Sequence, residues 1–252
     1  GRWLGPLKLA SGVTYGAYGS GALPVISGAV DIAAPVSWPA AGSVHTMPLS
    51  LGPQLPTQLF MEDTSGRVLK LTRARHPNVG QGAFGAGSRY LAVATDQDPG
   101  RSGELRINEG VLPSQADMGQ ALAFVRNDRW ALSAYRVEQV QRGRVLQIQP
   151  IRREILPVRP GWGYWLENAR WMLDSPGEWF YDQRKQQLHV WLPEGATGRP
   201  FKLRLSVAPH GVVGRDVRHF TLKDLEIRET ADDGIDITGA QDGFRIERVV
   251  VT

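Results

Sequence analysis

VRHFTLKDLEIRETADDGIDITGAQDGFRIERVVVT, residues 217–252, contains an apolar pattern that repeats after 24 residues. Between the two copies lies Gly234-Ile235-Asp236-Ile237, which alternates in the manner of another short strand. A period of this length, made of short strands and turns, is typical of a solenoid. The spacing is the same for four pairs of positions: Phe220 and Phe244, Leu222 and Ile246, Leu225 and Val249, and Ile227 and Val251.

Such a repeat predicts how the end of the chain folds. Each coil stacks on the previous one, so that equivalent side chains form internal ladders and only neighbouring coils touch. One coil cannot bury its own apolar face, and an open solenoid end would expose unpaired backbone groups. We therefore expect the same protein to continue C-terminal to Thr252. The alternative is a β-sandwich in which two strands resemble each other by chance.

An earlier stretch has the same character. Residues 6–28 give a strand, a Gly-Ser-Gly corner and a second strand that ends in Val25-Ile26-Ser27-Gly28. We expect residues 1–30 to form a first coil and residues 201–252 to form resumed coils, truncated at the C-terminus. From residue 31 to residue 200 the repeat disappears, and alternating strands and hairpins replace it. We predict that this insert is a mixed, mostly antiparallel β module, so that the whole chain is mainly β.

Three local patterns in the insert give specific predictions. Strand candidates at 130–139 and 144–149 surround Arg142-Gly143, which is a hairpin signal. Aromatic and β-branched residues alternate at 179–182 and 188–192, which indicates a second hairpin. Ser114-Gln115-Ala116-Asp117 has capping-box spacing ahead of an apolar run that reaches Val125, so we expect one short helix there.

The composition is that of an ordinary folded protein. The 252 residues are 42% hydrophobic and 21% charged, and cysteine is absent, which excludes disulfides and thiolate metal sites. The sequence has no run of about 18 apolar residues, so we expect no membrane span. The net charge of +4 is spread along the chain, and it therefore gives no reason to expect a nucleic-acid partner.

Three carboxylates near the repeat are the best candidates for chemistry. Asp232 and Asp233 lie in the turn before a short strand, and Asp236 should point outward because Ile235 and Ile237 point inward. Hydrolysis of a glycosidic bond needs two carboxyl groups that flank the bond, one as acid and one as nucleophile or base. We assign Asp233 and Asp236 to catalysis and Asp232 to substrate binding. The alternatives are that these carboxylates bind calcium through oxygen ligands, or that they form a solvated turn.

Aromatic side chains concentrate between residues 162 and 191, and two of them are candidate substrate contacts. Aromatic faces stack on sugar rings, so we assign Trp162 and Tyr164 to substrate binding; the alternative is that these rings form the core of the β module. The isolated His210 and His219 fit loop or core positions better than catalytic ones. Metalloprotease, nucleophile-elbow and nucleotide-binding motifs do not occur, and apart from calcium we expect no cofactor.

Five parts of the chain carry a resemblance to known proteins. They are Tyr18-Gly19-Ser20-Gly21 with Pro24-Val25-Ile26-Ser27-Gly28, Ala74-Arg75-His76-Pro77-Asn78, Tyr164-Trp165-Leu166-Glu167-Asn168, Leu173-Asp174-Ser175-Pro176-Gly177-Glu178-Trp179-Phe180-Tyr181-Asp182, and Leu188-His189-Val190-Trp191-Leu192-Pro193. Together these segments resemble a bacterial group of right-handed parallel β-helix proteins, which has the pectate-lyase-like fold and includes glycoside hydrolases and polysaccharide lyases. The resemblance implies a right-handed parallel β-helix with a β-rich insert after the first coil, and it implies that the reacting carboxylates usually sit on later coils.

The combined hypothesis is a carbohydrate-active protein that cleaves glycosidic bonds of a polysaccharide or oligosaccharide. We prefer a glycoside hydrolase, because the insert-bearing architecture resembles that group more. One alternative is a polysaccharide lyase, which needs a base beside a uronate and a cation to stabilise the enolate. Another is a non-catalytic glycan-binding or scaffold region of a larger β-helix protein. We expect a secreted or periplasmic location from the expected substrate; the lack of cysteine fits that location as well as a cytosolic one.

Overall fold

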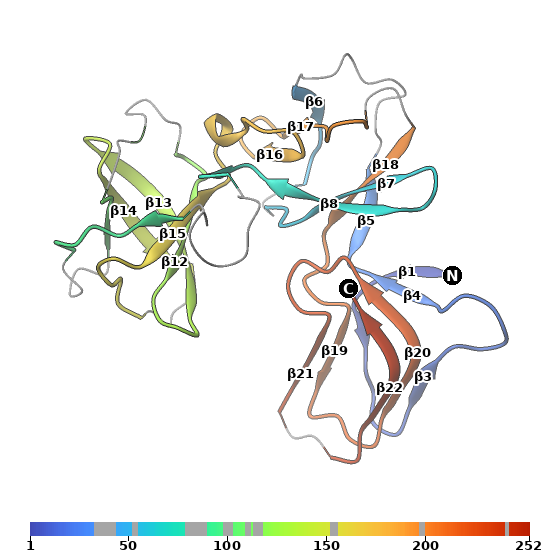
Figure 1. The fold of residues 1–252 in the computed structure, drawn as a ribbon. Helices are drawn as coiled ribbons and strands as arrows, with labels where there is room; N and C mark the ends of the chain where they lie inside the picture. Colours follow the sequence, from blue (N-terminus) through green and yellow to red (C-terminus); the bar gives the residue numbers. More distant parts are fainter. Residues whose placement is uncertain are drawn as a thin grey trace. The chain divides into compact units, whose positions relative to one another are not determined.

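The computed structural model of the protein describes residues 1–32, 44–51, 55–78, 90–97, 103–108, 112, 118–151, 156–196, 200–239 and 242–252. These residues form strands β1 to β22 and one short 3-10 helix, η1 (Arg170–Met172) (Figure 1), which confirms the prediction of a mainly β chain. None of the helical structure in these ranges is long and apolar enough to cross a membrane. The chain divides into two compact units: unit 1 comprises Gly1–Trp38, Leu51–Leu71 and Gly198–Thr252, and unit 2 comprises Pro39–Ser50 and Thr72–Thr197.

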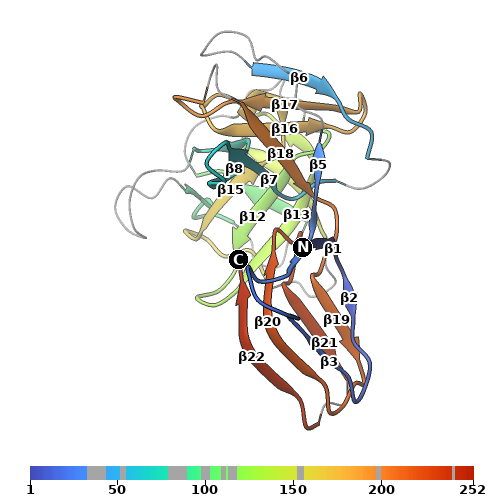
Figure 2. The ribbon, with the colours of Figure 1, turned by 90° about the vertical axis from the view of Figure 1, so that its right-hand side faces the viewer.

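Unit 1 contains two sheets of parallel strands. Figures 1 and 2 show β20 beside β22 and β19 beside β21, and from β19 to β22 the chain alternates between the two sheets. The first sheet has the order β1 (Arg2–Leu4), β4 (Val25–Ser27), β20 (Thr221–Arg228) and β22 (Arg245–Val251), and β3 (Thr14–Gly16) also pairs with β20. The second sheet has the order β2 (Leu7–Lys8), β19 (Val212–Arg215) and β21 (Ile235–Thr238).

The register of β20 and β22 is the one that the sequence repeat predicts. Leu222 pairs with Ile246, and the rings of Phe220 and Phe244 are stacked, with their centroids 5.5 Å apart and their planes at 9°. Side chains alternate across a strand, so one set from each strand faces the interior of the unit. The buried members of this interior are Ile26, Val212, Val217, Phe220, Leu222, Leu225 and Ile227.

A third, antiparallel sheet adds to unit 1. Gly28 links the parallel strand β4 to this sheet, and it lies against the backbone of Glu229 and Thr230. A Cβ atom on Gly28 would be 2.5 Å from the Thr230 Cα and 2.6 Å from the Glu229 carbonyl oxygen, so only glycine fits without a shift of the backbone. The strands of this sheet are β5 (Ala29–Ile32), β18 (Phe201–Ser206), β7 (Leu59–Asp63) and residues 68–71 of β8 (Val68–Arg73).

The substitution Gly28→Ala is expected to destabilise unit 1 by about 1–3 kcal/mol, because an added methyl group must displace backbone in a packed interior. The matched control is Gly103→Ala in unit 2, where an added Cβ meets nothing closer than 3.9 Å and φ is not positive. There alanine should be neutral or stabilise slightly, since it only restricts the unfolded chain. Urea denaturation of both variants measures the difference, and equal effects of the two substitutions would contradict the prediction.

Unit 2 consists of antiparallel strands around an apolar core. Its larger sheet has the order β10 (Leu91–Ala92), β15 (Gly163–Glu167), β12 (Leu122–Arg126), β13 (Leu132–Gln141), β14 (Val145–Pro150) and β11 (Glu104–Arg106), and β9 (Arg75–His76) also pairs with β15. A second group contains β16 (Glu178–Asp182), β17 (Gln187–Trp191) and β6 (Val44–Pro48), and residues 72–73 at the end of β8 pair in parallel with β16. The predicted boundaries at residues 30 and 200 stay predictions.

The local predictions for the insert have mixed outcomes. Both hairpins are confirmed as β13–β14 and β16–β17, and Arg142 and Gly143 have φ angles of 50° and 64°, as a primed hairpin turn requires. The predicted helix is wrong over Leu122–Arg126, which forms β12, and Ser114–Asp117 lie outside the described residues. Ala123 and Val125 alternate into the core and β12 has a partner strand on each side, so the sheet overrides the capping-box pattern.

Candidate active site

His210 lies between two of the carboxylates that the sequence indicates. Nδ1 of its ring is 3.8 Å from a carboxylate oxygen of Asp233, and Nε2 is 3.7 Å from a carboxylate oxygen of Asp236. Because the contacts use different nitrogens of one ring, the imidazole spaces the two carboxylates apart. Both distances are longer than a direct hydrogen bond, so the carboxylate oxygens keep lone pairs with which to accept from a ligand.

Parallel strand pairing explains why His210 meets these aspartates. Val213 in β19 pairs with Asp236 in β21, which is an offset of 23 residues along the chain. The same offset, applied to the turns that precede the two strands, brings His210 to Asp233. The group is therefore formed by one turn and strand stacked on the next.

The three side chains differ in exposure. The side chain of His210 is 22% exposed, against 38% for Asp236 and 63% for Asp233. Ile235 and Ile237 pack against the interior of unit 1, so Asp236 points outward between them. Nδ1 of His210 is buried and has no hydrogen-bond partner among the described residues. The arrangement is a half-buried imidazole with two more exposed carboxylates at its edge, where a ligand can reach them.

Asp232 is the neighbour of this group in the same turn. The Asp232 residue is exposed, and its backbone N–H donates to the Pro209 carbonyl over 2.8 Å, which ties this turn to the one that carries His210. Within the ranges that the structure describes, no group of three or more His, Asp or Glu side chains is arranged to hold a metal ion. The assignment of Asp232 to substrate binding stays a prediction. The expectation of no cofactor apart from calcium also stays a prediction.

The two aromatic candidates are in unit 2, in or next to β15. Tyr164 is completely buried in the unit 2 core, and burial raises the pKa of its phenol. Its ring therefore presents no face to a sugar in this structure. Trp162 is half-buried, and the guanidinium groups of Arg126 and Arg159 lie 5.6 and 5.7 Å from the centre of a Trp162 ring. Trp162 is thus already in contact with two cations.

His210 is the residue of the group that sequence inspection missed. The apolar repeat in β20 and β22 has an offset of 24 residues, and that offset would align His210 with Gly234. The pairing of β19 with β21 has an offset of 23, which aligns His210 with Asp233. A signal was therefore present, but it required a separate offset for each of the two parallel sheets.

Comparisons with known proteins bear on the fold. No family model and no curated protein matches the sequence. A solved structure named "Glycoside hydrolase" matches 82% of this chain with a TM-score of 0.58 and 17% sequence identity. The chain spans 37% of the length of that protein. At this level of identity the match shows a similar fold.

Proposed function

We propose that this chain belongs to a glycoside hydrolase that cleaves a polysaccharide or oligosaccharide, with Asp233 and Asp236 as the reacting carboxylates. The observation that carries the proposal is the placement of His210, whose two ring nitrogens lie within 4 Å of the two carboxylates. The name of the structural neighbour supports the same class of activity. A secreted or periplasmic location is part of the proposal, because large polysaccharides lie outside the cell.

The proposed architecture is a right-handed parallel β-helix. Residues 1–30 form its first coil, residues 31–200 form the inserted β module, and residues 201–252 resume the coils. Two observations support it: the strands of both parallel sheets pair one repeat apart, and the chain alternates between the sheets from β19 to β22. In such a solenoid, outward residues on stacked strands line a groove, and Asp236 is one of them.

The chemistry assigns complementary roles to the two aspartates. One carboxylic acid donates its proton to the glycosidic oxygen as the bond to the anomeric carbon breaks. The other carboxylate either takes a proton from the water that attacks that carbon, or attacks the carbon itself to form a glycosyl ester. In the second case the first residue, now a carboxylate, takes a proton from the water that cleaves this ester, so that water supplies the new hydroxyl group in both cases. His210 is a positioning residue here, because its ring lies beside both carboxylates and keeps them apart.

The test is activity on a panel of neutral and acidic polysaccharides. Hydrolysis gives new reducing ends without unsaturated sugars. Asp236→Asn is expected to lower the rate at least 100-fold, because general acid or base catalysis contributes about 10²–10⁴-fold. The control is Asp242→Asn, which removes an exposed carboxylate beyond the C-terminal end of β21. Full activity of Asp236→Asn would show that the reacting groups lie elsewhere.

A polysaccharide lyase is the second candidate, and the imidazole favours it. An imidazole ring is a common general base, and here it could take the proton next to a uronate. Formation of an unsaturated uronate by the wild type, and its loss in His210→Gln, would show that the reaction is elimination and not hydrolysis. Saccharide binding without any product would instead support the glycan-binding or scaffold alternative.

A further inference from the structure

We propose that unit 2 contains a separate binding site for an anionic sugar, in a pocket where Trp130 stacks on the sugar ring and Arg126 and Arg129 bind its carboxylate or sulfate group. The pocket has a volume of about 700 Å³. This lies in the range of small-molecule sites, which is about 300–1,000 Å³. The site is built entirely from unit 2 residues, so it does not depend on the roles proposed for His210 and the two aspartates.

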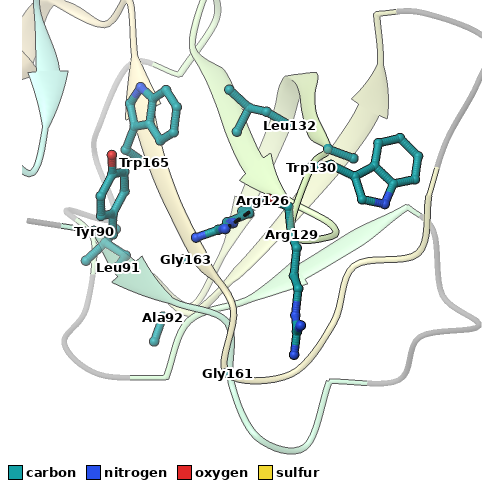
Figure 3. A pocket seen from close by; sticks show the side chains of 11 residues that line it. Tyr90, Leu91, Ala92, Arg126, Arg129, Trp130, Leu132, Gly161, Gly163 and Trp165 are labelled. Atoms are coloured by element: carbon teal, nitrogen blue, oxygen red, sulfur yellow. Dashed lines mark hydrogen bonds between the residues drawn. The ribbon is translucent and has the colours of Figure 1, made fainter. Parts of the chain in front are cut away.

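The pocket is formed where three strands of the larger sheet meet a turn. Tyr90 and the strand β10 lie on one side with Trp165 of β15, and Arg126 is the last residue of β12. The turn between β12 and β13 adds Arg129 and Trp130. Figure 3 shows Arg126 between the Tyr90–Trp165 pair and Trp130. The arrangement therefore places a cation between aromatic rings.

The described lining of the pocket is positively charged. None of the described residues that line it is acidic. The guanidinium of Arg126 donates to the backbone carbonyls of Asp128 and Arg129, at 3.4 and 3.0 Å, rather than to a carboxylate. The carboxylate of Asp128 is instead paired with Arg159 at 2.9 Å. Arg126 and Arg129 thus form no ion pair within the described part of the chain, and an anionic ligand would supply the missing partner.

The aromatic rings have two distinct roles. Trp165 is held in place, because its Nε1–H donates to Glu167 at 2.7 Å and its ring stacks on Phe124 at 5.1 Å. Trp130 is 81% exposed, so it contributes little to the core. Leu132, which is 54% exposed, and Tyr90, which is 38% exposed, line the same pocket as the two arginines. The exposed Trp130 indole is therefore available to a ligand that enters the pocket.

The combination of groups selects the class of ligand. A sugar ring has an apolar face that stacks on an indole, and a carboxylate or sulfate group accepts two parallel hydrogen bonds from a guanidinium. A neutral sugar would use the indole alone and would offer neither arginine an anionic group. The pocket is therefore expected to prefer acidic over neutral saccharides.

The experiment measures binding to the wild-type protein by calorimetry, and chromatography of each ligand after the titration verifies that it is uncleaved. The probes are a uronic-acid trisaccharide, a sulfated trisaccharide and a neutral trisaccharide of matched ring number. We expect at least one acidic probe to bind, and the neutral probe to bind about tenfold more weakly or not at all. The acidic probe that binds more tightly shows whether the pocket prefers a carboxylate or a sulfate group.

Three variants locate the binding. Arg126→Gln, Arg129→Gln and Trp130→Ala should each weaken binding of the acidic probe about tenfold or more, while circular dichroism verifies that the fold is retained. Arg144→Gln removes an exposed arginine outside the pocket and should leave affinity unchanged. Failure of every acidic probe to bind, equal binding of the neutral probe or of a short oligonucleotide, or an equal loss in Arg144→Gln would each overturn the assignment. None of these outcomes bears on hydrolysis.

Discussion

Replacing Arg204 with methionine is expected to lower the free energy of unfolding of unit 1 by about 3–5 kcal/mol, the usual cost of breaking a buried ion pair by removing one partner. The side chain of Arg204 is 3% exposed, and its guanidinium contacts the carboxylates of Glu62 and Glu229. Glu229 is also buried. The substitution would therefore leave the Glu229 charge in the interior without its closest cation.

The effect should be large because Glu229 connects several strands. One of its carboxylate oxygens accepts from the Ser27 hydroxyl at 2.9 Å and from Arg2 at 3.4 Å. Its backbone carbonyl accepts from the Ser206 hydroxyl at 2.8 Å. These contacts join the first parallel sheet of unit 1 to its antiparallel sheet, so loss of Arg204 weakens the place where the two sheets meet.

The control is an exposed arginine of the same unit that has its own close carboxylate partner. Arg248 donates to both oxygens of the Asp224 carboxylate, at 2.6 and 2.9 Å, and its side chain is 67% exposed. Exposed pairs contribute little, so Arg248→Met should change stability far less than Arg204→Met. Urea denaturation followed by circular dichroism compares them, with hydrogen exchange of β18 and β20 to localise the change. Similar losses in the two variants would contradict the assigned role of burial.

The double variant Arg204→Met with Glu229→Met gives an independent check. Replacing both members of a buried pair by apolar side chains is often neutral, whereas removing one is not. The double variant should therefore be more stable than Arg204→Met alone. If the double variant instead lost as much stability as Arg204→Met and Glu229→Met lose together when measured singly, the two side chains would contribute by their shape and not as a charge pair.

The part of the fold that could be predicted from the sequence is the part with a strict period. The spacing of Phe220 and Phe244 predicts both the direction and the register of β20 and β22, because stacked coils must align equivalent side chains. The hairpin at Arg142-Gly143 was also predictable, since a primed turn needs two residues that tolerate positive φ. In both cases a local pattern and the tertiary structure agree.

The remaining features depend on contacts that the sequence does not encode locally. β12 follows a helix-start pattern, and only its partner strands β13 and β15 make it a strand. Tyr164 alternates along β15 like its neighbours, and whether its face points to core or solvent depends on what packs on that side of the sheet. His210 joins Asp233 only through a pairing offset that differs by one residue between the two parallel sheets.

Raising the pH from 4.5 to 7 is expected to destabilise unit 2 through Glu178. This residue is 3% exposed, and burial, with a smaller contribution from the nearby Asp174 charge, raises the pKa of its carboxyl to about 7. In the unfolded chain the carboxyl loses its proton near pH 4.5. Between these values the folded state holds one more proton, so the free energy of unfolding is highest below pH 4.5 and falls by about 2–3 kcal/mol by pH 7.

The variant Glu178→Gln isolates this contribution from the other titrating groups. Burial lowers the pKa values of His45, His76 and His189, and their titration makes the protein more stable as the pH rises, opposite in sign to Glu178. The glutamine side chain stays neutral and can still accept the hydrogen bonds from the backbone N–H groups of Asp174 and Ser175. The variant should therefore match the wild type at pH 4 and exceed its stability at pH 8, as measured by urea denaturation at each pH. If the two stability curves run parallel from pH 4 to pH 8, Glu178 does not titrate in this window, and its carboxylate is ionised in the folded protein.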